Sequence, residues 1–460
     1  MRSRTLVLAI TLITALLGCP SLRADEHEGA VRPLTDSDAR AGKQLYIREC
    51  GACHGERGLG NGPAAAELNP RPRNFIKRVF KFRTTPSGRA PATADVLRVI
   101  ERGIPGTAMP AFAFLPEGDR KKIAAYVLEL ADLLEEPEPE AIPAPASQPP
   151  TTPESIAHGK SLYQDIECFS CHGNLGKGDG PSAPTLKDTE GRPIQARDLT
   201  TGIFRGGSDR LDLYYRISTG MDGSPMPSFA DSIDDADRWA LVDYVLSLKA
   251  PATAKARPSD PIAAGREVIA KYNCQGCHIL DDGKGGEVGP DFRLAGQKLL
   301  SDWVRKFLKA PREAGKIYPW RPWRMPDLGM SDEEVGVMTK YLAAVGQKKD
   351  QAVALPDSSK FPAALVEEGK NLFGIVCAQC HALGKVVQTP VAAQQGPDLI
   401  DASSRVDFEW EKKWVSDPKK IDPKTKMTIV PLTLEQVDGV RMFVWKASIA
   451  AKAAGAANNP

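Results

Sequence analysis

Cysteine and histidine recur along this chain in one fixed arrangement. Eight of its nine cysteines form four pairs, and in every pair two residues separate the cysteines and a histidine follows the second one. The four motifs are Cys50, Cys53 and His54; Cys168, Cys171 and His172; Cys274, Cys277 and His278; and Cys377, Cys380 and His381. Two thiols and an imidazole this close together could form a disulfide, a redox-active dithiol, a zinc site or an attachment site for a haem.

The repetition separates these chemistries. A disulfide framework does not account for the histidine, a thioredoxin-like dithiol would occur once, and zinc would use two C-x-x-C pairs per site without the histidines. Covalent haem attachment accounts for every residue. The two thiols add to the two vinyl groups of the porphyrin within one helical turn, and the histidine supplies the proximal nitrogen to iron. We therefore predict four covalently attached haem c groups, with His54, His172, His278 and His381 as iron ligands.

Each motif must be held by the helices around it. A similar helix precedes every motif, with a glycine eight or nine residues before the first cysteine: Gly42, Gly159, Gly265 and Gly369. An amphipathic helix closes every repeat, with an aromatic residue at the matching place: Tyr126, Tyr244, Tyr341 and Phe443. A small residue on the first helix lets the last helix cross it closely. The period is roughly 100 residues, which is the size of a domain rather than of a solenoid unit.

This pattern resembles the class I cytochrome c domain, repeated four times. The resemblance implies an all-α fold, with helices wrapped around each haem and no sheet of consequence. We expect domains at residues 31–135, 154–249, 260–347 and 362–450. Proline-rich and polar linkers join them, and residues 134–153 are expected to be an extended, semi-rigid spacer. Residues 452–460 are expected to be a loose tail.

The resembled family places a methionine on the other face of the iron. Met-Pro occurs before the last helix of three repeats, which assigns Met109, Met226 and Met325 as ligands. Repeat four departs from this pattern, because a threonine follows Met427. Its spacing from the motif histidine is close to that of repeat three, so Met427 is the expected fourth ligand. If that assignment is wrong, haem 4 has a position open to small molecules.

Two other methionines compete for these roles. Met221 in repeat two and Met330 in repeat three also precede the last helix, but no proline follows either of them. We therefore rank both below Met226 and Met325.

A glycine–proline pair follows each motif histidine at a short distance. The four pairs are Gly62-Pro63, Gly180-Pro181, Gly289-Pro290 and Gly396-Pro397. In the resembled family, the carbonyl of this proline accepts a hydrogen bond from Nδ1 of the haem histidine and so orients the ring. The resemblance therefore implies that role for Pro63, Pro181, Pro290 and Pro397.

The repeats form two kinds, and they carry two basic runs. Repeats one and two share a glycine-rich run after the motif, whereas repeats three and four share Gly-Pro-Asp and a tryptophan downstream. Residues 71–83 and 298–324 are rich in Lys and Arg. They are candidate docking faces, although a solvated basic face is the more ordinary explanation. The two remaining histidines, His27 and His158, are expected to be solvated.

The first 24 residues resemble an export signal. Arg2 and Arg4 precede an apolar stretch at residues 6–17, which is too short to span a bilayer. Two ends fit: lipidation of Cys19, or cleavage after Ala24 with loss of Cys19. We expect an exported, periplasmic protein, either soluble or held to the membrane by a lipid at Cys19.

Composition and the ligand set together point to a function. Hydrophobic content of 42%, charged content of 26% and a net charge of +2 are ordinary for a globular protein and give no sign of nucleic acid binding. Four irons capped by His and Met have no vacant position, which favours an electron-transfer protein in a respiratory chain over an enzyme. Two alternatives stay open: an electron-accepting haem subunit of an exported dehydrogenase, and a haem enzyme with an open site at haem 4. The sequence does not indicate the donor or the acceptor.

Overall fold

The computed structural model describes residues 32–143, 145, 147–251, 256–314, 323–347, 356–389 and 396–457. The predictions of an export signal, of lipidation at Cys19 and of a solvated His27 lie outside the described residues.

The described residues confirm the predicted all-α fold. They form helices and a few isolated antiparallel bridges, with no β-strand among them. None of the described helices has the length and apolarity needed to cross a membrane. Four helical units follow one another along the chain, and each has its own hydrophobic core.

The units are named here in chain order. Unit 1 contains α1 (Asp36–Glu49), α2 (Gly51–His54), η1 (Ala65–Glu67), η2 (Phe75–Lys77), α3 (Thr93–Arg102) and α4 (Glu117–Leu130). Unit 2 contains α5 (Pro153–Asp165), α6 (Phe169–His172), η3 (Ala183–Thr185), η4 (Leu199–Thr201), α7 (Arg210–Thr219) and α8 (Asp235–Ser247). Unit 3 contains α9 (Pro261–Tyr272), η5 (Cys274–Gly276), α10 (Phe292–Lys298), α11 (Ser301–Lys309), α12 (Pro311–Ala314) and α13 (Asp332–Val345). Unit 4 contains η7 (Ser358–Lys360), α14 (Ala363–Ile375), η8 (Cys377–Gln379), α15 (Ala402–Arg405), α16 (Phe408–Ser416), α17 (Pro418–Ile421) and α18 (Leu434–Ala457).

Local sequence signals start the helices of these units. Thr35 caps α1 by accepting a hydrogen bond from the backbone N–H of Asp38, and the Asp38 carboxylate accepts one from the backbone N–H of Thr35. Thr152 with Ser155, and Ser331 with Glu334, form the same reciprocal box at α5 and α13.

The first and last long helices of each unit cross at the predicted glycines. A Cβ atom at Gly42, Gly159 or Gly369 would lie 2.0 Å from a backbone carbonyl oxygen of the crossing helix, and one at Gly265 would lie 2.4 Å from the Tyr341 ring. Larger residues cannot fit at these crossings without moving the helices apart. The paired helices are α1 with α4, α5 with α8, α9 with α13 and α14 with α18.

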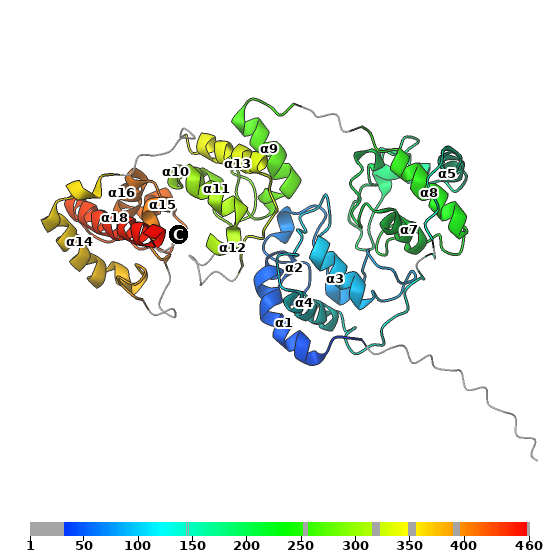
Figure 1. Ribbon diagram of the computed structural model, residues 1–460, viewed down its shortest axis with the longest axis horizontal. Helices are drawn as coiled ribbons and strands as arrows, with labels where there is room; N and C mark the ends of the chain where they lie inside the picture. Colours follow the sequence, from blue (N-terminus) through cyan, green and yellow to red (C-terminus); the bar gives the residue numbers. More distant parts are fainter. Residues whose placement is uncertain are drawn as a thin grey trace, which may run out of the picture.

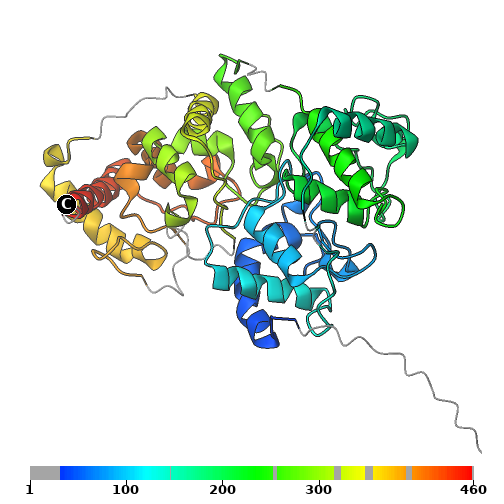
Figure 2. The ribbon, with the colours of Figure 1, turned by 45° about the vertical axis from the view of Figure 1, so that its right-hand side comes forward.

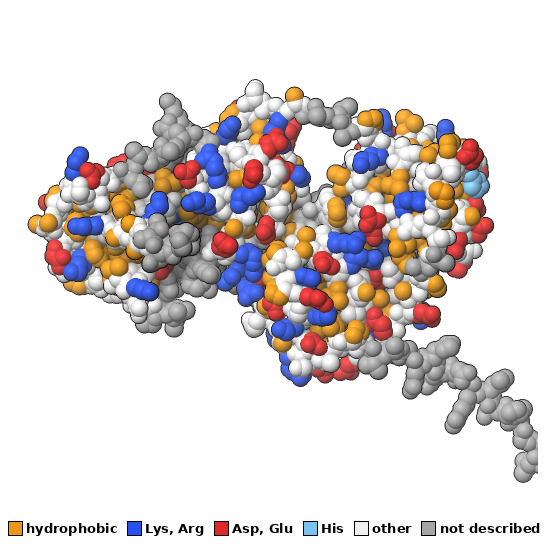
Figure 3. All heavy atoms as spheres, in the orientation of Figure 1, with side chains coloured by type: hydrophobic (Ala, Val, Ile, Leu, Met, Phe, Trp, Pro, Cys, Tyr) orange, Lys and Arg blue, Asp and Glu red, His pale blue; other side chains and the backbone are white. Residues whose placement is uncertain are grey.

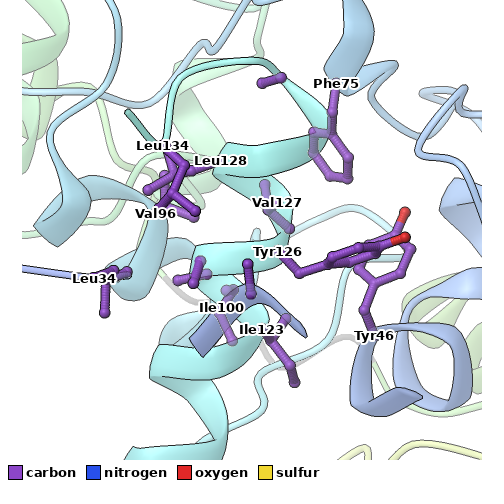
Figure 4. Close-up of a cluster of buried hydrophobic side chains, with 14 of the residues drawn as sticks. Leu34, Tyr46, Phe75, Val96, Ile100, Ile123, Tyr126, Val127, Leu128 and Leu134 are labelled. Atoms are coloured by element: carbon purple, nitrogen blue, oxygen red, sulfur yellow. The ribbon is translucent and has the colours of Figure 1, made fainter. Parts of the chain in front are cut away.

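Aromatic side chains fill the space beside three of these crossings. In unit 1 the rings of Tyr46 and Tyr126 meet edge to face with centroids 5.1 Å apart, among the buried side chains around α4 (Figure 4). The equivalent pairs are Tyr163 with Tyr244 and Phe373 with Phe443. The sequence prediction of a glycine–aromatic crossing is confirmed in all four units.

Replacing Gly369 by alanine is expected to destabilise unit 4 by about 1–3 kcal/mol, because the new Cβ would overlap a backbone atom that cannot rotate away. Thermal denaturation followed by circular dichroism would measure this. Gly374 lies in the same helix and a Cβ there meets nothing within 4 Å, so Gly374→Ala is the matched control. Equal melting temperatures for the two variants would contradict the close crossing.

Unit 1 lies against both unit 2 and unit 3, and unit 4 packs on the side of unit 3 that faces away from unit 2 (Figures 1 and 2). The order in space therefore differs from the order along the chain. The prediction that residues 134–153 act as a spacer is wrong, because units 1 and 2 pack directly. Arg216 of α7 donates 2.6 Å to the carbonyl of Lys81 and also donates to the carbonyl of Arg83.

The segment between α4 and α5 instead lies against both units. Glu138 accepts hydrogen bonds from Arg32 and Thr93 of unit 1. The carbonyl of Pro149 accepts one from Arg210 of unit 2, at 2.6 Å. The predicted loose tail is wrong for residues 452–457, because α18 continues to Ala457.

Candidate haem-binding sites

Each Cys-x-x-Cys-His motif forms a single helical turn. The backbone N–H of every motif histidine donates to the carbonyl of the first cysteine, at 2.9 to 3.0 Å. The turn is α-helical in units 1 and 2 (α2 and α6), and the first three motif residues form a 3-10 turn in units 3 and 4 (η5 and η8). In each unit the turn directly follows the first long helix, which fixes where the two thiols and the imidazole stand.

All four motifs open onto one cavity. Its volume is about 2450 Å³, and its wall includes the eight motif cysteines, the four motif histidines, and Met109, Met226, Met325 and Met427. Shared among four sites, this is about 600 Å³ each, within the range of roughly 300–1,000 Å³ that cofactor pockets occupy. The structure therefore brings all the predicted site residues to one continuous space.

The imidazole rings are held in a single tautomer. Nδ1 of each motif histidine lies 2.8 to 3.1 Å from a backbone carbonyl oxygen. Because a carbonyl can only accept, Nδ1 carries the hydrogen, and Nε2 is the ring nitrogen that can coordinate iron. Burial lowers the pKa of His54 to about 4, and burial also lowers the pKa of His172 and His381. These rings are therefore neutral at physiological pH, as a metal ligand must be.

The carbonyl acceptors correct part of the sequence prediction. Pro290 and Pro397 accept from His278 and His381, as predicted. In units 1 and 2 the acceptors are instead Arg73 and Arg197, so the roles predicted for Pro63 and Pro181 are wrong.

The length of the following loop explains the difference. In all four units the backbone N–H of this glycine donates to the carbonyl of the second motif cysteine. A Cβ at Gly62 or Gly180 would lie 2.4 Å from a carbonyl oxygen of the motif turn, whereas one at Gly289 or Gly396 would meet the imidazole. The chain therefore passes beneath the motif turn at this point in units 1 and 2, and beside the ring in units 3 and 4. In units 1 and 2 the chain then needs a longer path before it reaches the imidazole.

A shared local turn marks the true acceptor in every unit. The residue after the acceptor is Asn74, Asp198, Asp291 or Asp398, and its side chain accepts a hydrogen bond from the backbone two residues on. This is an Asx turn. A Phe or Leu follows, and the rings of Phe75 and Phe292 stack on His54 and His278 with centroids 4.7 and 4.5 Å apart. The tripeptides Arg-Asn-Phe, Arg-Asp-Leu, Pro-Asp-Phe and Pro-Asp-Leu carried this signal in the sequence.

Glycines keep the backbone close to two of the imidazoles. A Cβ at Gly289 would lie 2.3 Å from Cε1 of His278, and one at Gly396 would lie 2.2 Å from Cε1 of His381. Only glycine fits beside these rings. The geometry of the residues present therefore fits a flat group bound against the histidine.

The motif thiols line the cavity, and burial raises the pKa of six of the eight. Burial raises the pKa of Cys53 and Cys274 to about 12, and that of Cys168 and Cys377 to about 11. All eight are free cysteines, and the described residues contain no group of three or more His, Cys, Asp or Glu placed to hold a metal ion. These observations disfavour the disulfide and zinc alternatives. Thiols beside a neutral imidazole suit the formation of thioethers with a haem.

The methionine loops can be compared between units. The backbone N–H of Ile104 donates to the carbonyl of Met109, and that of Met221 donates to Met226, so Met221 occupies the position of Ile104. A position filled by isoleucine in unit 1 is not a ligand position, which favours Met226. Met330 is 5% exposed within the core of unit 3, as expected for a packing residue.

Basic side chains line the cavity between units 1 and 2. Lys81 has its pKa lowered to about 8 by burial and then by Arg73 and Arg205. Nε of Arg205 is buried without a hydrogen-bond partner. Such cations suit the carboxylates of a haem. The predicted docking face at residues 71–83 is wrong, because Arg83 is fully buried and this segment packs against unit 2.

The predicted basic face at residues 298–324 is only partly described. The backbone of Lys298 contacts unit 4, and Arg312 pairs with Glu49 of unit 1. These two residues therefore face neighbouring units. The prediction for His158 is confirmed, since its ring is exposed and lies 2.7 Å from Asp237.

Known families match three of the four units. The family described as cytochrome c matches residues 156–249 and 262–346. The family described as cytochrome c oxidase, cbb3-type, subunit III matches residues 37–127. These matches identify the three segments as cytochrome c domains, which carry covalently bound haem c.

Individual proteins show the same likeness. The cbb3-type cytochrome c oxidase subunit CcoP of Azospirillum sp. (strain B510) is 29% identical over 46% of this chain and 62% of its own length. Subunit FixPc of Rhizobium leguminosarum bv. viciae is 33% identical over 30% of this chain and 44% of its own length. A chain of the Kuenenia stuttgartiensis reducing HAO-like protein complex is 40% identical, with a TM-score of 0.45, and covers 47% of this chain and 97% of that one. The chain spans less than two thirds of the length of these curated relatives.

The fold and the sites thus define a class, helical domains that carry haem c. Because several such domains are present, the chain is a multihaem c-type cytochrome.

Proposed function

We propose that the chain is a tetrahaem cytochrome that passes electrons between redox proteins outside the cytoplasm. One observation carries the proposal: four imidazoles, each held by a carbonyl and preceded by two thiols, share a cavity wall with four methionines. The eight motif cysteines would attach the haems. The iron ligands would be His54 and Met109, His172 and Met226, His278 and Met325, and His381 and Met427. A bound haem supplies an iron that changes oxidation state.

The protein's own groups would prepare the iron for that role. The carbonyl on Nδ1 orients the imidazole and increases its basicity, and the buried setting excludes water. With both axial positions taken by protein groups, the iron exchanges electrons without binding substrate.

The domain boundaries belong to the same proposal. We place haem domains at residues 31–135, 154–249, 260–347 and 362–450, and an export signal at residues 1–24, with lipidation of Cys19 as one way of holding the protein to the membrane. The family matches support the first three domains, and the hydrogen-bonded Asx turn and cavity of unit 4 support the last.

Unit 4 lacks the Met-Pro pair, yet its loop resembles that of unit 1. The backbone N–H of Met427 donates 3.2 Å to Oγ1 of Thr425, and that of Met109 donates 3.1 Å to Oγ1 of Thr107. The same local turn thus presents both methionines, which supports Met427 as the fourth methionine ligand.

Carbon monoxide tests the ligand set. The reduced, haem-loaded protein is expected to hold four haems per chain and to show no carbon monoxide difference spectrum, because every iron is capped. Met427→Ala should then bind one carbon monoxide per chain. Met221→Leu is the control and should bind none.

Two results would contradict this assignment. Binding by the unaltered protein would show an open iron and favour a haem enzyme, with Met427 the first ligand to discard. Binding by Met221→Leu would instead move the ligand role of unit 2 from Met226 to Met221.

The likeness to CcoP favours a second candidate, a haem subunit of a larger respiratory complex. The face seen in Figure 3 has basic and acidic side chains interspersed over all four units, so it shows no single charged face that would select a partner. Gentle extraction followed by native mass measurement distinguishes the two. A haem-bearing species much heavier than 49.7 kDa with a second polypeptide supports the subunit, and a species at the mass of the chain supports the free carrier.

A further inference from the structure

Units 1 and 2 meet through equivalent surfaces. A side chain at Gly106, three residues before Met109, would contact Arg197 at 3.3 Å and Ile203 at 3.5 Å. A side chain at Gly223, three residues before Met226, would contact the corresponding residues of unit 1, Val79 at 2.7 Å and Arg73 at 3.5 Å. Each methionine loop thus packs on the segment that holds the histidine of the other unit. This reciprocity is the signature of a two-fold related pair.

Units 3 and 4 also meet through equivalent positions. Leu299 and Val406 form an antiparallel bridge between the units. The backbone N–H of Leu300 donates 3.0 Å to Arg405, and that of Asp407 donates 2.8 Å to Lys298. The two hydrogen bonds use equivalent positions of the two units, with the donor one residue after the bridge and the acceptor one residue before it. The bridge residues Leu299 and Val406 both line the cavity. A second two-fold related pair of sites results.

The two pairs join through units 1 and 3, at the haem motifs themselves. A Cβ at Gly276, which lies between the two cysteines of the third motif, would be 2.2 Å from the Leu68 side chain. The 3-10 turn η1 of unit 1 also packs against η5, the turn that carries the third motif.

An ion pair strengthens this junction. Arg312 of α12 donates to both carboxylate oxygens of Glu49, at 2.6 and 3.0 Å. Glu49 is the residue directly before the first motif cysteine, and its side chain is 1% exposed.

Unit 2 has no comparable junction with unit 3 in the described part of the chain. Its hydrogen bonds and ion pairs to other units end on unit 1, as those of Arg216, Thr219, Asp212 and Asp222 show. Figure 1 shows unit 1 lying against both unit 2 and unit 3.

We infer that electrons cross the protein in the order haem 2, haem 1, haem 3, haem 4, and not in the order of the motifs along the chain. The inference rests on the proposed function. Electron tunnelling weakens steeply with distance, so each transfer uses the nearest neighbour. Haem 1 is then the bridge between the two pairs, and haems 2 and 4 are the ends at which partners exchange electrons.

A photosensitiser attached at either end tests this order in the full, haem-loaded chain. Leu175 in unit 2 and Ile375 in unit 4 are 63% and 70% exposed, and either can be replaced by cysteine to carry a ruthenium complex. Electrons are injected by a flash in the presence of a sacrificial donor. The change in absorbance at the haem α-band then gives the number of haems that are reduced in the fast phase. The parent protein is expected to fill four from either label.

Met109→His should lower the potential of haem 1 and remove it from the route. From the unit 2 label, only haem 2 is expected to be reduced in the fast phase. From the unit 4 label, haems 4 and 3 are expected to be reduced in the fast phase. The haems on the far side of haem 1 should be reduced at least tenfold more slowly. Three fast haems from both labels would show that electrons pass directly between units 2 and 3, and would overturn the inferred order.

A variant that leaves every ligand in place tests the junction independently. Leu68→Trp combined with Arg312→Glu should push units 1 and 3 apart and give two fast haems from each label. Lys309→Glu is the control, because Lys309 pairs with Asp332 inside unit 3, and it should keep four. Four fast haems in the double variant would overturn the order. A parent chain with fewer than four haems, or with no reduction from either label, would contradict the proposed function instead.

Discussion

A chain in which both Cys168 and Cys171 are replaced by alanine is expected to carry three covalent haems and to lose the folded structure of unit 2. Without its thioethers this site has nothing to hold the haem irreversibly. About 600 Å³ of the cavity would then stand empty, and at about 24 cal/mol per Å³ such a void costs on the order of 10 kcal/mol. That is comparable with the whole stability of a typical domain.

Intact mass and circular dichroism would measure both effects. The mass should fall by one haem and the helical signal by the share that α5 to α8 contribute. Ser170→Ala alters a residue between the two cysteines and leaves both thiols in place, so it should keep four haems and serves as the control. A double variant that still carries four haems would show that the second motif is not an attachment site.

The parts of the site that were predictable from the sequence are those set by short-range geometry. The motif places two thiols and an imidazole in one helical turn wherever it occurs, because the spacing alone determines the turn. The helix crossings were also predictable, since Gly42 and its equivalents repeat at the same distance from each motif. Both features were found in all four units.

The histidine acceptors in units 1 and 2 were not predictable by the same argument. Arg73 and Arg197 lie 19 and 25 residues after their histidines, across loops whose lengths differ. Glycine–proline pairs occur in every unit but perform two different tasks, and only the loop length separates them. The Asx residue and the apolar residue after each acceptor were the better guide.

The packing between units was beyond sequence reasoning for another reason. The proline-rich composition of residues 134–153 described the local backbone correctly, since the described residues between α4 and α5 form no helix. It said nothing about whether units 1 and 2 attract each other. That attraction depends on buried arginines such as Arg83 and Arg216, whose partners are distant in the sequence. Because the sequence does not show those partners, the basic residues at 71–83 were interpreted as an exposed docking face.

Arg83→Ala is expected to destabilise the pair of units 1 and 2 by about 3–5 kcal/mol. The Arg83 side chain is completely buried and donates to the carbonyls of Phe80, Pro86 and Thr219, the last of these across the interface. It also forms an ion pair of 2.9 Å with Asp222 of unit 2. Removing one partner of a buried pair costs this much because the three carbonyls lose a donor and Asp222 loses its cation, keeping only the hydrogen bonds from Ser87 and Gly88.

Calorimetry of the haem-loaded protein would show this destabilisation as a lower melting temperature for the transition in which units 1 and 2 unfold. Arg89→Ala, in the same loop but exposed, should change stability by less than about 0.5 kcal/mol. A double-mutant cycle with Asp222→Ala isolates the pair, and we expect a coupling of about 1–3 kcal/mol. A coupling near zero would mean that the ion pair with Asp222 contributes nothing, and that Arg83 acts across the interface only through its hydrogen bond to Thr219. The contact between the methionine loop of unit 2 and the histidine segment of unit 1 would then depend on Arg216 and the paired glycines.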